Sequence, residues 1–149
     1  MLQAGASMPN VAAEDDTGSS VALRDLGKKT LVVYFYPRAD TPGCTNETIQ
    51  FSGLNAKFAK KGAVIVGVSR DTIAAQAKFK AKYDVPFALL ADVNSAICDA
   101  FGVIVEKNMY GKKSLGIQRS TFLIVGGKIT KVWPKVKVDG HAAEVLSSL

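Results

Sequence analysis

Cysteine and histidine are scarce in this chain of 149 residues, which holds two cysteines, Cys44 and Cys98, and a single histidine, His141. Zinc sites take several cysteine or histidine ligands at characteristic spacings, and the sequence contains neither a CxxC pair nor a second histidine. We therefore expect no bound metal. In a chain without an export signal, two such thiols are expected to be free or catalytic rather than joined in a structural disulfide.

Long hydrophobic runs are also absent. No stretch reaches the roughly 20 consecutive apolar residues of a membrane-spanning helix. The first residues, Met1 to Pro9, contain neither the basic segment nor the apolar segment of an export signal. We therefore expect a soluble, cytoplasmic protein with no membrane partner.

Acidic residues are fewer than basic ones, 13 against 19, which gives a net charge of +6. The excess is spread along the chain rather than concentrated in a patch, and no known nucleic-acid motif is visible. A solvated basic face explains the charge, so we expect no nucleic-acid partner. The densest basic segment carries Lys128, Lys131, Lys135 and Lys137.

Hydrophobic residues make up 48% of the sequence, enough for the core of one domain over residues 1–149. Alternating strands and helices favour parallel strand pairing, and their order predicts an α/β thioredoxin-like fold with an amino-terminal extension and a central mixed sheet flanked by helices. We expect the extension, with one hairpin or short strand, before residue 30; strands at 31–36, 64–68 and 87–90; helices at 42–61, 72–83, 95–101 and 140–149; a long loop at 107–116; and a hairpin of strands 121–125 and 128–133 around Gly126-Gly127.

The segment from Tyr36 to Glu47, YPRADTPGCTNE, carries the strongest chemical signal. Thr41 suits the N-cap of the helix that follows, and Pro42 suits its first position. Cys44 then falls in the first turn, where backbone N–H groups lack intrahelical partners and the helix dipole is positive, so that a thiolate is favoured. The same spacing is equally consistent with a small buried cysteine behind an ordinary cap.

A resemblance to a known family favours the reactive thiol. Pro37, Thr41 and Cys44 form the Pro-x-x-x-Thr-x-x-Cys pattern of the peroxiredoxins, and TPGCT followed by Glu47 resembles the bacterioferritin-comigratory-protein, or Q-type, branch. The resemblance extends over nearly the whole chain. It includes Gly67-Val68-Ser69, Asn108-Met109-Tyr110-Gly111 and Gly116-Ile117-x-Arg119-Ser120-Thr121-Phe122.

The resemblance implies a role for each residue of this pattern. The thiolate of Cys44 would attack a hydroperoxide and become a sulfenic acid. Thr41 and the amides around Gly43 and Cys44 would bind the peroxide, and Pro37 would shield it from water. Arg119 would polarise the peroxide and stabilise developing charge. Glu47 would orient Arg119 through a charge-assisted hydrogen bond.

The chain departs from the family at the resolving cysteine. Members that carry this second thiol have it five positions or about 36 positions after the first, and the corresponding residues here are Ile49 and Lys80. Cys98 remains, beside Ile97 and Phe101, either as a packed core residue or as a resolving cysteine that would require local unfolding. The expected cycle uses one cysteine, reduced by thioredoxin or another external thiol.

We therefore predict a thiol-dependent peroxidase acting on hydrogen peroxide and organic hydroperoxides in antioxidant defence and cell redox homeostasis. It would be a monomer or weak homodimer without metal, haem or flavin. The alternatives are a redox-sensing or holdase-like binding protein, a thiol–disulfide oxidoreductase and a hydrolase that pairs Cys44 with His141. The missing CxxC argues against the second alternative, and the lack of an orienting third group argues against the last.

Overall fold

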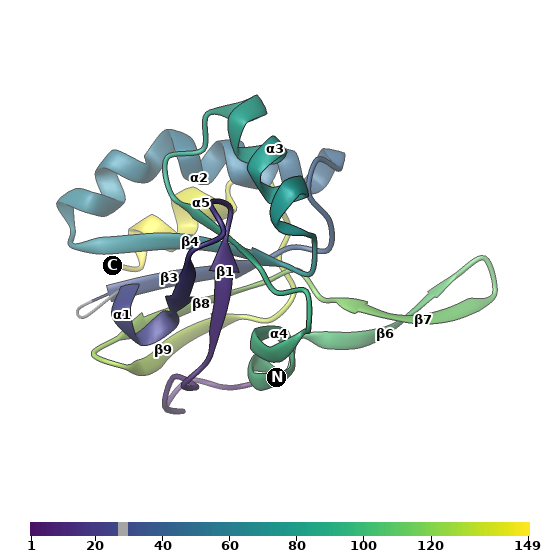
Figure 1. The fold of residues 1–149 in the computed structure, drawn as a ribbon. Coiled ribbons are helices and arrows are strands. Elements are labelled where there is room, and N and C mark those ends of the chain that lie inside the picture. The colour runs from purple at the N-terminus through teal and green to yellow at the C-terminus, as the bar shows by residue number, and fades with distance from the viewer. Residues whose placement is uncertain (27–29) are drawn as a thin grey trace.

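A seven-stranded mixed sheet forms the centre of the computed structural model, which describes residues 1–26 and 30–149 (Figure 1). Its strand order is β2-β1-β5-β4-β3-β8-β9, with β3 parallel to β4, β4 parallel to β5, and β8 antiparallel to β3. The sheet strands are β1 (Ala12–Asp15), β2 (Ser20–Ala22), β3 (Thr30–Phe35), β4 (Ala63–Ser69), β5 (Ala88–Ala91), β8 (Ser120–Val125) and β9 (Lys128–Trp133).

Helices cover both faces of this sheet. The helices are α1 (Leu23–Leu26), α2 (Pro42–Lys60), α3 (Ile73–Tyr83), α4 (Ala96–Phe101) and α5 (His141–Ser147). In Figure 1, α2, α3 and α5 lie on one face, while α1 and α4 lie on the other. The predicted thioredoxin-like architecture is confirmed.

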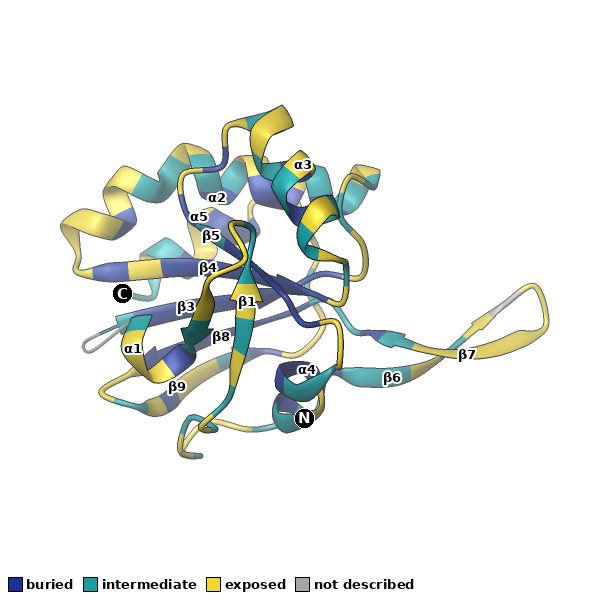
Figure 2. Ribbon diagram, in the orientation of Figure 1, coloured by how far each residue is buried: buried dark blue, intermediate teal, exposed yellow. Residues whose placement is uncertain are grey.

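The pleat of β3 divides the core into two clusters. Val32, Tyr34 and Tyr36 pack with α2, α3 and α5, whereas Leu31 and Val33 pack with α1 and α4. All five side chains are fully buried, because successive residues of a central strand point to opposite covered faces. Figure 2 shows this strand as part of a continuous buried layer.

The prediction of a long loop over 107–116 is wrong. This segment belongs to a two-stranded hairpin, β6 (Ile104–Met109) and β7 (Lys112–Ile117), which projects from the body of the molecule in Figure 1. Tyr110 and Gly111 make its turn with positive φ angles of 54° and 77°. Most of the hairpin is exposed or half-buried (Figure 2), so its sequence lacks the apolar alternation by which a strand is recognised.

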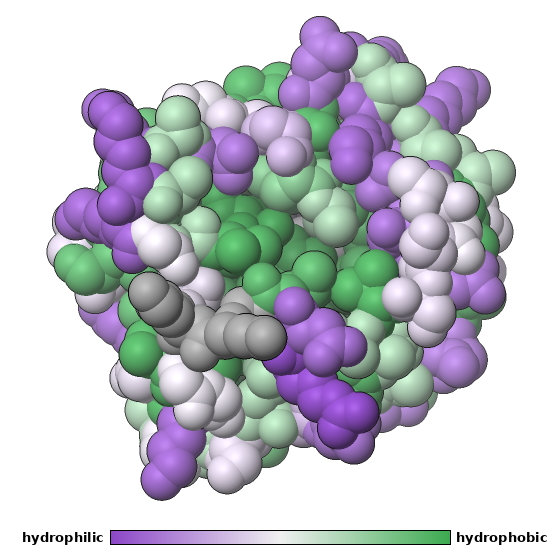
Figure 3. Space-filling view, turned by 60° about the vertical axis from the view of Figure 1, so that its left-hand side comes forward, coloured by the Kyte–Doolittle hydropathy of each residue, from purple (hydrophilic) through white to green (hydrophobic). Residues whose placement is uncertain are grey.

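The amino-terminal extension contains the expected hairpin, formed by β1 and β2, and also the short helix α1. Residues 27–29 at the end of the expected extension lie outside the described residues. Figure 3 shows a face on which hydrophobic side chains gather in a shallow hollow between hydrophilic ones. Large exposed hydrophobic residues such as Val64, Val93 and Leu115 come from different elements, a distribution that is ordinary for a protein surface.

No helix among residues 1–26 and 30–149 combines the length and apolar character needed to cross a bilayer.

Candidate active site

The site lies where β3 ends and α2 begins. The buried strand leads through Tyr36 into an exposed turn, and Pro42 then opens the 19-residue helix α2. Cys44 is the third residue of this helix, and its side chain is buried against the sheet, with only 1% of its surface exposed. Pro37 is exposed in the turn that precedes the helix.

Thr41 occupies the predicted N-cap position but does not cap the helix with its side chain. Its hydroxyl instead donates a hydrogen bond of 2.8 Å to the carbonyl oxygen of Arg38. A hydroxyl has one proton to donate, so Thr41 Oγ1 keeps its accepting lone pairs. The first-turn amides of Gly43 and Cys44 donate no hydrogen bond to the Thr41 side chain, so N–H donors and a hydroxyl acceptor lie together at one helix end.

Arg119 joins Cys44 to Glu47 from the opposite side of the site. Arg119 immediately precedes β8, which pairs with β3, and this pairing brings residues 75 positions apart together. The Nη2 atom of Arg119 lies 3.3 Å from Cys44 Sγ, and its Nη1 atom donates a 2.8 Å bond to Glu47 Oε1. The guanidinium therefore contacts the sulfur with one edge while a carboxylate holds the other.

Gly43 makes this approach of Arg119 possible. A Cβ atom added to Gly43 would lie 3.0 Å from Arg119 Nη2, closer than nearly all real Cβ contacts. A side chain here would push the guanidinium away from Cys44 Sγ. The close approach of Arg119 therefore explains why position 43 of the TPGCT segment is a glycine.

Burial and the opposite charge of the partner shift the pKa values of Glu47 and Arg119 in opposite directions. Burial raises the pKa of Glu47 to about 7, although Arg119 opposes the shift. Burial also disfavours the charge of Arg119, but Glu47 and Cys44 outweigh it, so that the pKa of Arg119 lies above its usual value. Glu47 Oε2 is buried without a hydrogen-bond partner among the described residues, which leaves Arg119 as the partner of this carboxylate.

A polar network behind the site was not predicted from the sequence. Asp71 Oδ2 accepts the amide of Ala39 at 2.8 Å and the hydroxyl of Ser69 at 2.6 Å. Gln76 donates to Ser69 Oγ and accepts a 2.6 Å bond from the Tyr36 hydroxyl. The network ties the end of β4 to the turn before Cys44. The sequence does contain a signal for this network: polar residues come directly after the buried parallel strand β4. The carboxyl ends of parallel strands lie at the same edge of a sheet, so such residues are expected near the end of β3.

The two positions at which the resemblance predicts a resolving thiol are occupied by other side chains. Ile49 lies on α2 with 46% of its surface exposed, and Lys80 on α3 forms an ion pair with Asp16. Cys98 belongs to the core cluster on the other face of the sheet from Cys44. Burial, followed by the carboxylate of Asp92, raises the pKa of the Cys98 thiol. The sheet therefore separates the two cysteines.

His141 is a core residue. Its side chain shares a 2.7 Å hydrogen bond with Thr121 Oγ1, and its ring packs edge-on against Phe51 and Trp133. Burial lowers the pKa of His141 to about 4, so the ring is neutral at physiological pH. These contacts occupy the imidazole and give it no hydrogen bond to Cys44.

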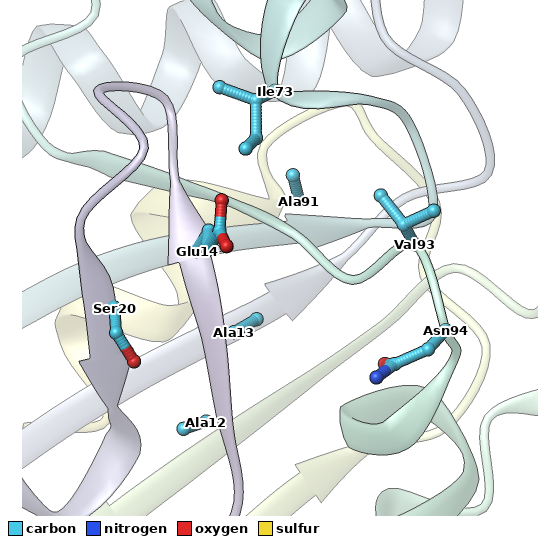
Figure 4. Close-up of a pocket in the computed structure, with 8 residues that line it drawn as sticks. All are labelled: Ala12, Ala13, Glu14, Ser20, Ile73, Ala91, Val93 and Asn94. Carbon is cyan, nitrogen blue, oxygen red and sulfur yellow. The ribbon is translucent and has the colours of Figure 1, made fainter.

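A separate hollow of about 370 Å³ lies between the amino-terminal hairpin and the region around β5 (Figure 4). Small side chains such as Ala13 and Ala91 form much of its wall, and Glu14 is the one ionisable group among the residues that line it. It contains no thiol. Among residues 1–26 and 30–149, no three histidine, cysteine or acidic side chains are grouped to bind a metal.

Comparison with known proteins agrees with this site. The model of the AhpC/TSA family matches residues 4–132. A peroxiredoxin Bcp of Xanthomonas campestris is 50% identical over 133 residues, covering 89% of this chain and 83% of the relative. A peroxiredoxin Bcp of Bacillus subtilis is 43% identical over 149 residues, covering 99% and 95%. The chain therefore belongs to the AhpC/TSA family.

Solved structures narrow the relationship to one branch of that family. The bacterioferritin comigratory protein of X. campestris, studied for alkyl peroxide reduction, has a TM-score of 0.91 and 44% identity, with 97% of this chain and 96% of that chain covered. A peroxiredoxin Q of Xylella fastidiosa has a TM-score of 0.94 and 37% identity, with coverages of 99% and 95%. The expected Q-type peroxiredoxin, and with it thiol-dependent peroxidase activity, is confirmed.

Proposed function

We propose that the thiolate of Cys44 reduces hydrogen peroxide and organic hydroperoxides in a cycle that uses this cysteine alone. The observation that carries the proposal is the 3.3 Å approach of Arg119 Nη2 to Cys44 Sγ at the start of α2, with Glu47 holding the guanidinium. The cation, the helix dipole and the first-turn amides all favour negative charge on the sulfur and on the peroxide oxygen that leaves when the O–O bond breaks.

The first step transfers one oxygen atom. The sulfur lone pair of Cys44 attacks the terminal oxygen of the peroxide, an S–O bond forms, and the O–O bond breaks. The leaving oxygen keeps the bonding electron pair and takes up a proton, giving water or an alcohol. Cys44 is oxidised by two electrons to a sulfenic acid, and the peroxide is reduced by the same two electrons.

The surrounding groups divide the work of positioning and charge stabilisation. Thr41 Oγ1 accepts the peroxide O–H, because its own proton is donated to Arg38. The amides of Gly43 and Cys44 donate to the peroxide oxygens, and Arg119 stabilises the charge that develops on the leaving oxygen. Glu47 keeps Arg119 in place, and Pro37 limits the access of water to the attacking sulfur.

An external thiol completes the cycle. Thioredoxin or a small thiol attacks the sulfenic acid, releasing water and leaving a mixed disulfide, and a second thiol then frees Cys44 as a thiolate. Cys98 takes no part in this step, because it lies in the core cluster on the other face of the sheet from Cys44. We also propose that residues 1–149 act as one domain, as a monomer or weak homodimer, in the cytoplasm, without a nucleic-acid or membrane partner.

The test is stopped-flow peroxide consumption with a thiol reductant. We expect Cys44→Ser to abolish turnover and Cys98→Ser to retain most of it, the latter serving as the matched control. Peroxide reduction by Cys44→Ser at the wild-type rate would refute the role of Cys44. Oxidation of Cys44 without turnover by any thiol would instead favour the redox-sensor alternative.

A further inference from the structure

Two cationic side chains approach the site without taking part in the Arg119–Glu47 pair. Arg70 directly follows β4, at the sheet edge where β3 leads to Cys44. Its Nη2 atom donates a 3.3 Å hydrogen bond to the carbonyl oxygen of Leu115 on β7. Arg70 is thereby attached to the projecting hairpin near its base, where the strands of Figure 1 leave the body of the molecule.

Lys107 reaches the same region from β6 because Gly116 has no side chain. Lys107 pairs with Ser114 in the hairpin register, and its side chain runs diagonally over Gly116 on β7. A Cβ atom at Gly116 would lie 3.2 Å from Lys107 Cδ and 3.7 Å from its Nζ. The glycine thus gives the lysine stem a path toward the base of the hairpin, which leads through Ile117 to Arg119.

Lys107 and Arg70 both lie at the base of the hairpin, where their cationic groups meet the neighbouring residues Gly116 and Leu115. Burial, the positive charges of Arg119 and Arg70, and an opposing effect of Cys44 together hold the pKa of Lys107 below its ordinary value. Burial, more than the two neighbouring cations, disfavours the charged ammonium group. An added anion would relieve this.

The nearby carboxylates are engaged elsewhere. Glu47 is bound to Arg119, and Asp71 accepts hydrogen bonds from Ala39 and Ser69. Within residues 1–26 and 30–149, neither Arg70 nor Lys107 forms an ion pair. Two cations with unused hydrogen-bond donors are therefore held at the base of the hairpin, from which β7 leads to Arg119.

We propose that Arg70 and Lys107 form an anion subsite beside Cys44 that binds a carboxylate group of the substrate or of the reductant. The proposal rests on the peroxidase function of Cys44 and specifies which molecules that site prefers. A guanidinium and an ammonium are the side-chain groups that bind carboxylates most strongly in proteins. The carboxylate can belong to an organic hydroperoxide, such as that of a fatty acid, or to a thiol reductant.

Matched probes separate these two sources. For the oxidising step, kcat/KM is measured with a fatty-acid hydroperoxide and with its methyl ester, which differ in charge but share the reacting group. For the reducing step, the rate of sulfenic acid reduction is measured with mercaptopropionate and with mercaptoethanol. The informative quantity in each arm is the ratio of the charged to the neutral probe, because intrinsic reactivity cancels between wild type and variant.

Lys107→Met keeps an apolar stem over Gly116 and removes the charge. We expect it to lower the charged-to-neutral ratio about three- to tenfold in at least one arm, with a larger loss when Arg70→Met is added. Lys107→Glu should lower the ratio further, and added salt should weaken the preference of the wild type. Lys112→Met, which removes an exposed lysine of the same hairpin, is the control and should leave both ratios unchanged.

A response in the peroxide arm assigns the subsite to the substrate, and a response in the thiol arm assigns it to the reductant. Ratios that Lys107→Met, the double variant and Lys107→Glu leave equal to wild type in both arms would overturn the proposal. Consumption of hydrogen peroxide, which has no carboxylate, is measured alongside. It tests the function of Cys44 separately, so loss of the subsite and loss of the peroxidase are distinguishable.

Discussion

The two cysteines of this chain occupy the same position in two different helices. Cys44 is the third residue of α2, and Cys98 is the third residue of α4. Their exposed surface is 1% and 0%, so burial does not distinguish them. The difference lies in what meets the amino-terminal amides. At α4 the carboxylate of Asp92 accepts the amides of Ile97 and Cys98, at 3.1 and 2.8 Å.

At α2 no acidic residue lies in the first turn, and Arg119 stands beside the sulfur instead. One helix start is therefore neutralised by a buried carboxylate, while the other is left positive and reinforced by a cation. A cysteine at a helix start is therefore not activated by its position alone. The helix end must also be left open to an anion.

The strongest prediction is that hydrogen peroxide oxidises one of the two thiols and not the other. One equivalent of hydrogen peroxide should convert Cys44 to a sulfenic acid that dimedone traps, and should leave Cys98 unmodified. Cys98 should become reactive only when the protein is unfolded in denaturant, because its burial and the nearby Asp92 disfavour the thiolate. Peptide mass spectrometry measures both. A crosslinked Cys44–Cys98 peptide from native protein would contradict the one-cysteine cycle.

The next effect concerns the cation that distinguishes Cys44. Arg119→Met should lower kcat/KM for hydrogen peroxide by about a hundredfold, the size expected on removing a donor to developing charge. Gly43→Ala should lower it by roughly tenfold, since the added methyl displaces Arg119 Nη2. Gly53→Ala is the matched control, because a Cβ there meets nothing within 4 Å on the same helix.

Gly53→Ala should keep wild-type activity and gain up to about 1 kcal/mol in free energy of unfolding, as alanine favours a helix over glycine. A Gly43→Ala variant as active as Gly53→Ala would show that the contact with Arg119 does not matter for the rate.

The smallest effect is a pH dependence of stability from Glu47. Its pKa is raised from 4.5 to about 7, so the folded protein binds a proton that the unfolded chain has released between these values. Stability supplied by this group should therefore fall by on the order of 2–3 kcal/mol as pH rises through that window. Urea unfolding from pH 4.5 to 8 measures the change.

Glu47→Gln should remove this contribution, since glutamine does not titrate, and should leave the opposite contribution of His141. The difference between wild type and variant therefore isolates Glu47. It should also weaken the hold on Arg119 and lower the peroxide rate above pH 7, where the wild-type carboxylate is charged. Glu106→Gln, at an exposed ion pair with Lys113, should change neither quantity. An unchanged slope in Glu47→Gln would assign the fall in stability to groups other than Glu47. His141 is not among them, because its lowered pKa makes stability rise with pH.

The main features of the fold followed from local patterns. Continuous apolar runs identified the strands of the sheet, and the Thr41-Pro42 pair identified the start of α2. The hairpin of β6 and β7 could not be recognised in this way, because it buries little of either face and presents no period. The polar network of Asp71, Ser69 and Gln76 was missed because its members act through contacts between separate elements.

The sequence by itself determined that Cys44 lies at a helix start. Through its resemblance to the peroxiredoxins, it also indicated Arg119 and Glu47 as the side chains beside Cys44. Only the tertiary structure decided that the sheet separates Cys98 from Cys44 and that Asp92 occupies the other helix end. It also decided that the absence of a side chain at Gly43 leaves space for the Arg119 guanidinium, and that the absence of one at Gly116 leaves space for the Lys107 side chain. Helix starts and strands arise from interactions between near neighbours, whereas the charge around a thiol depends on side chains brought together across the sheet.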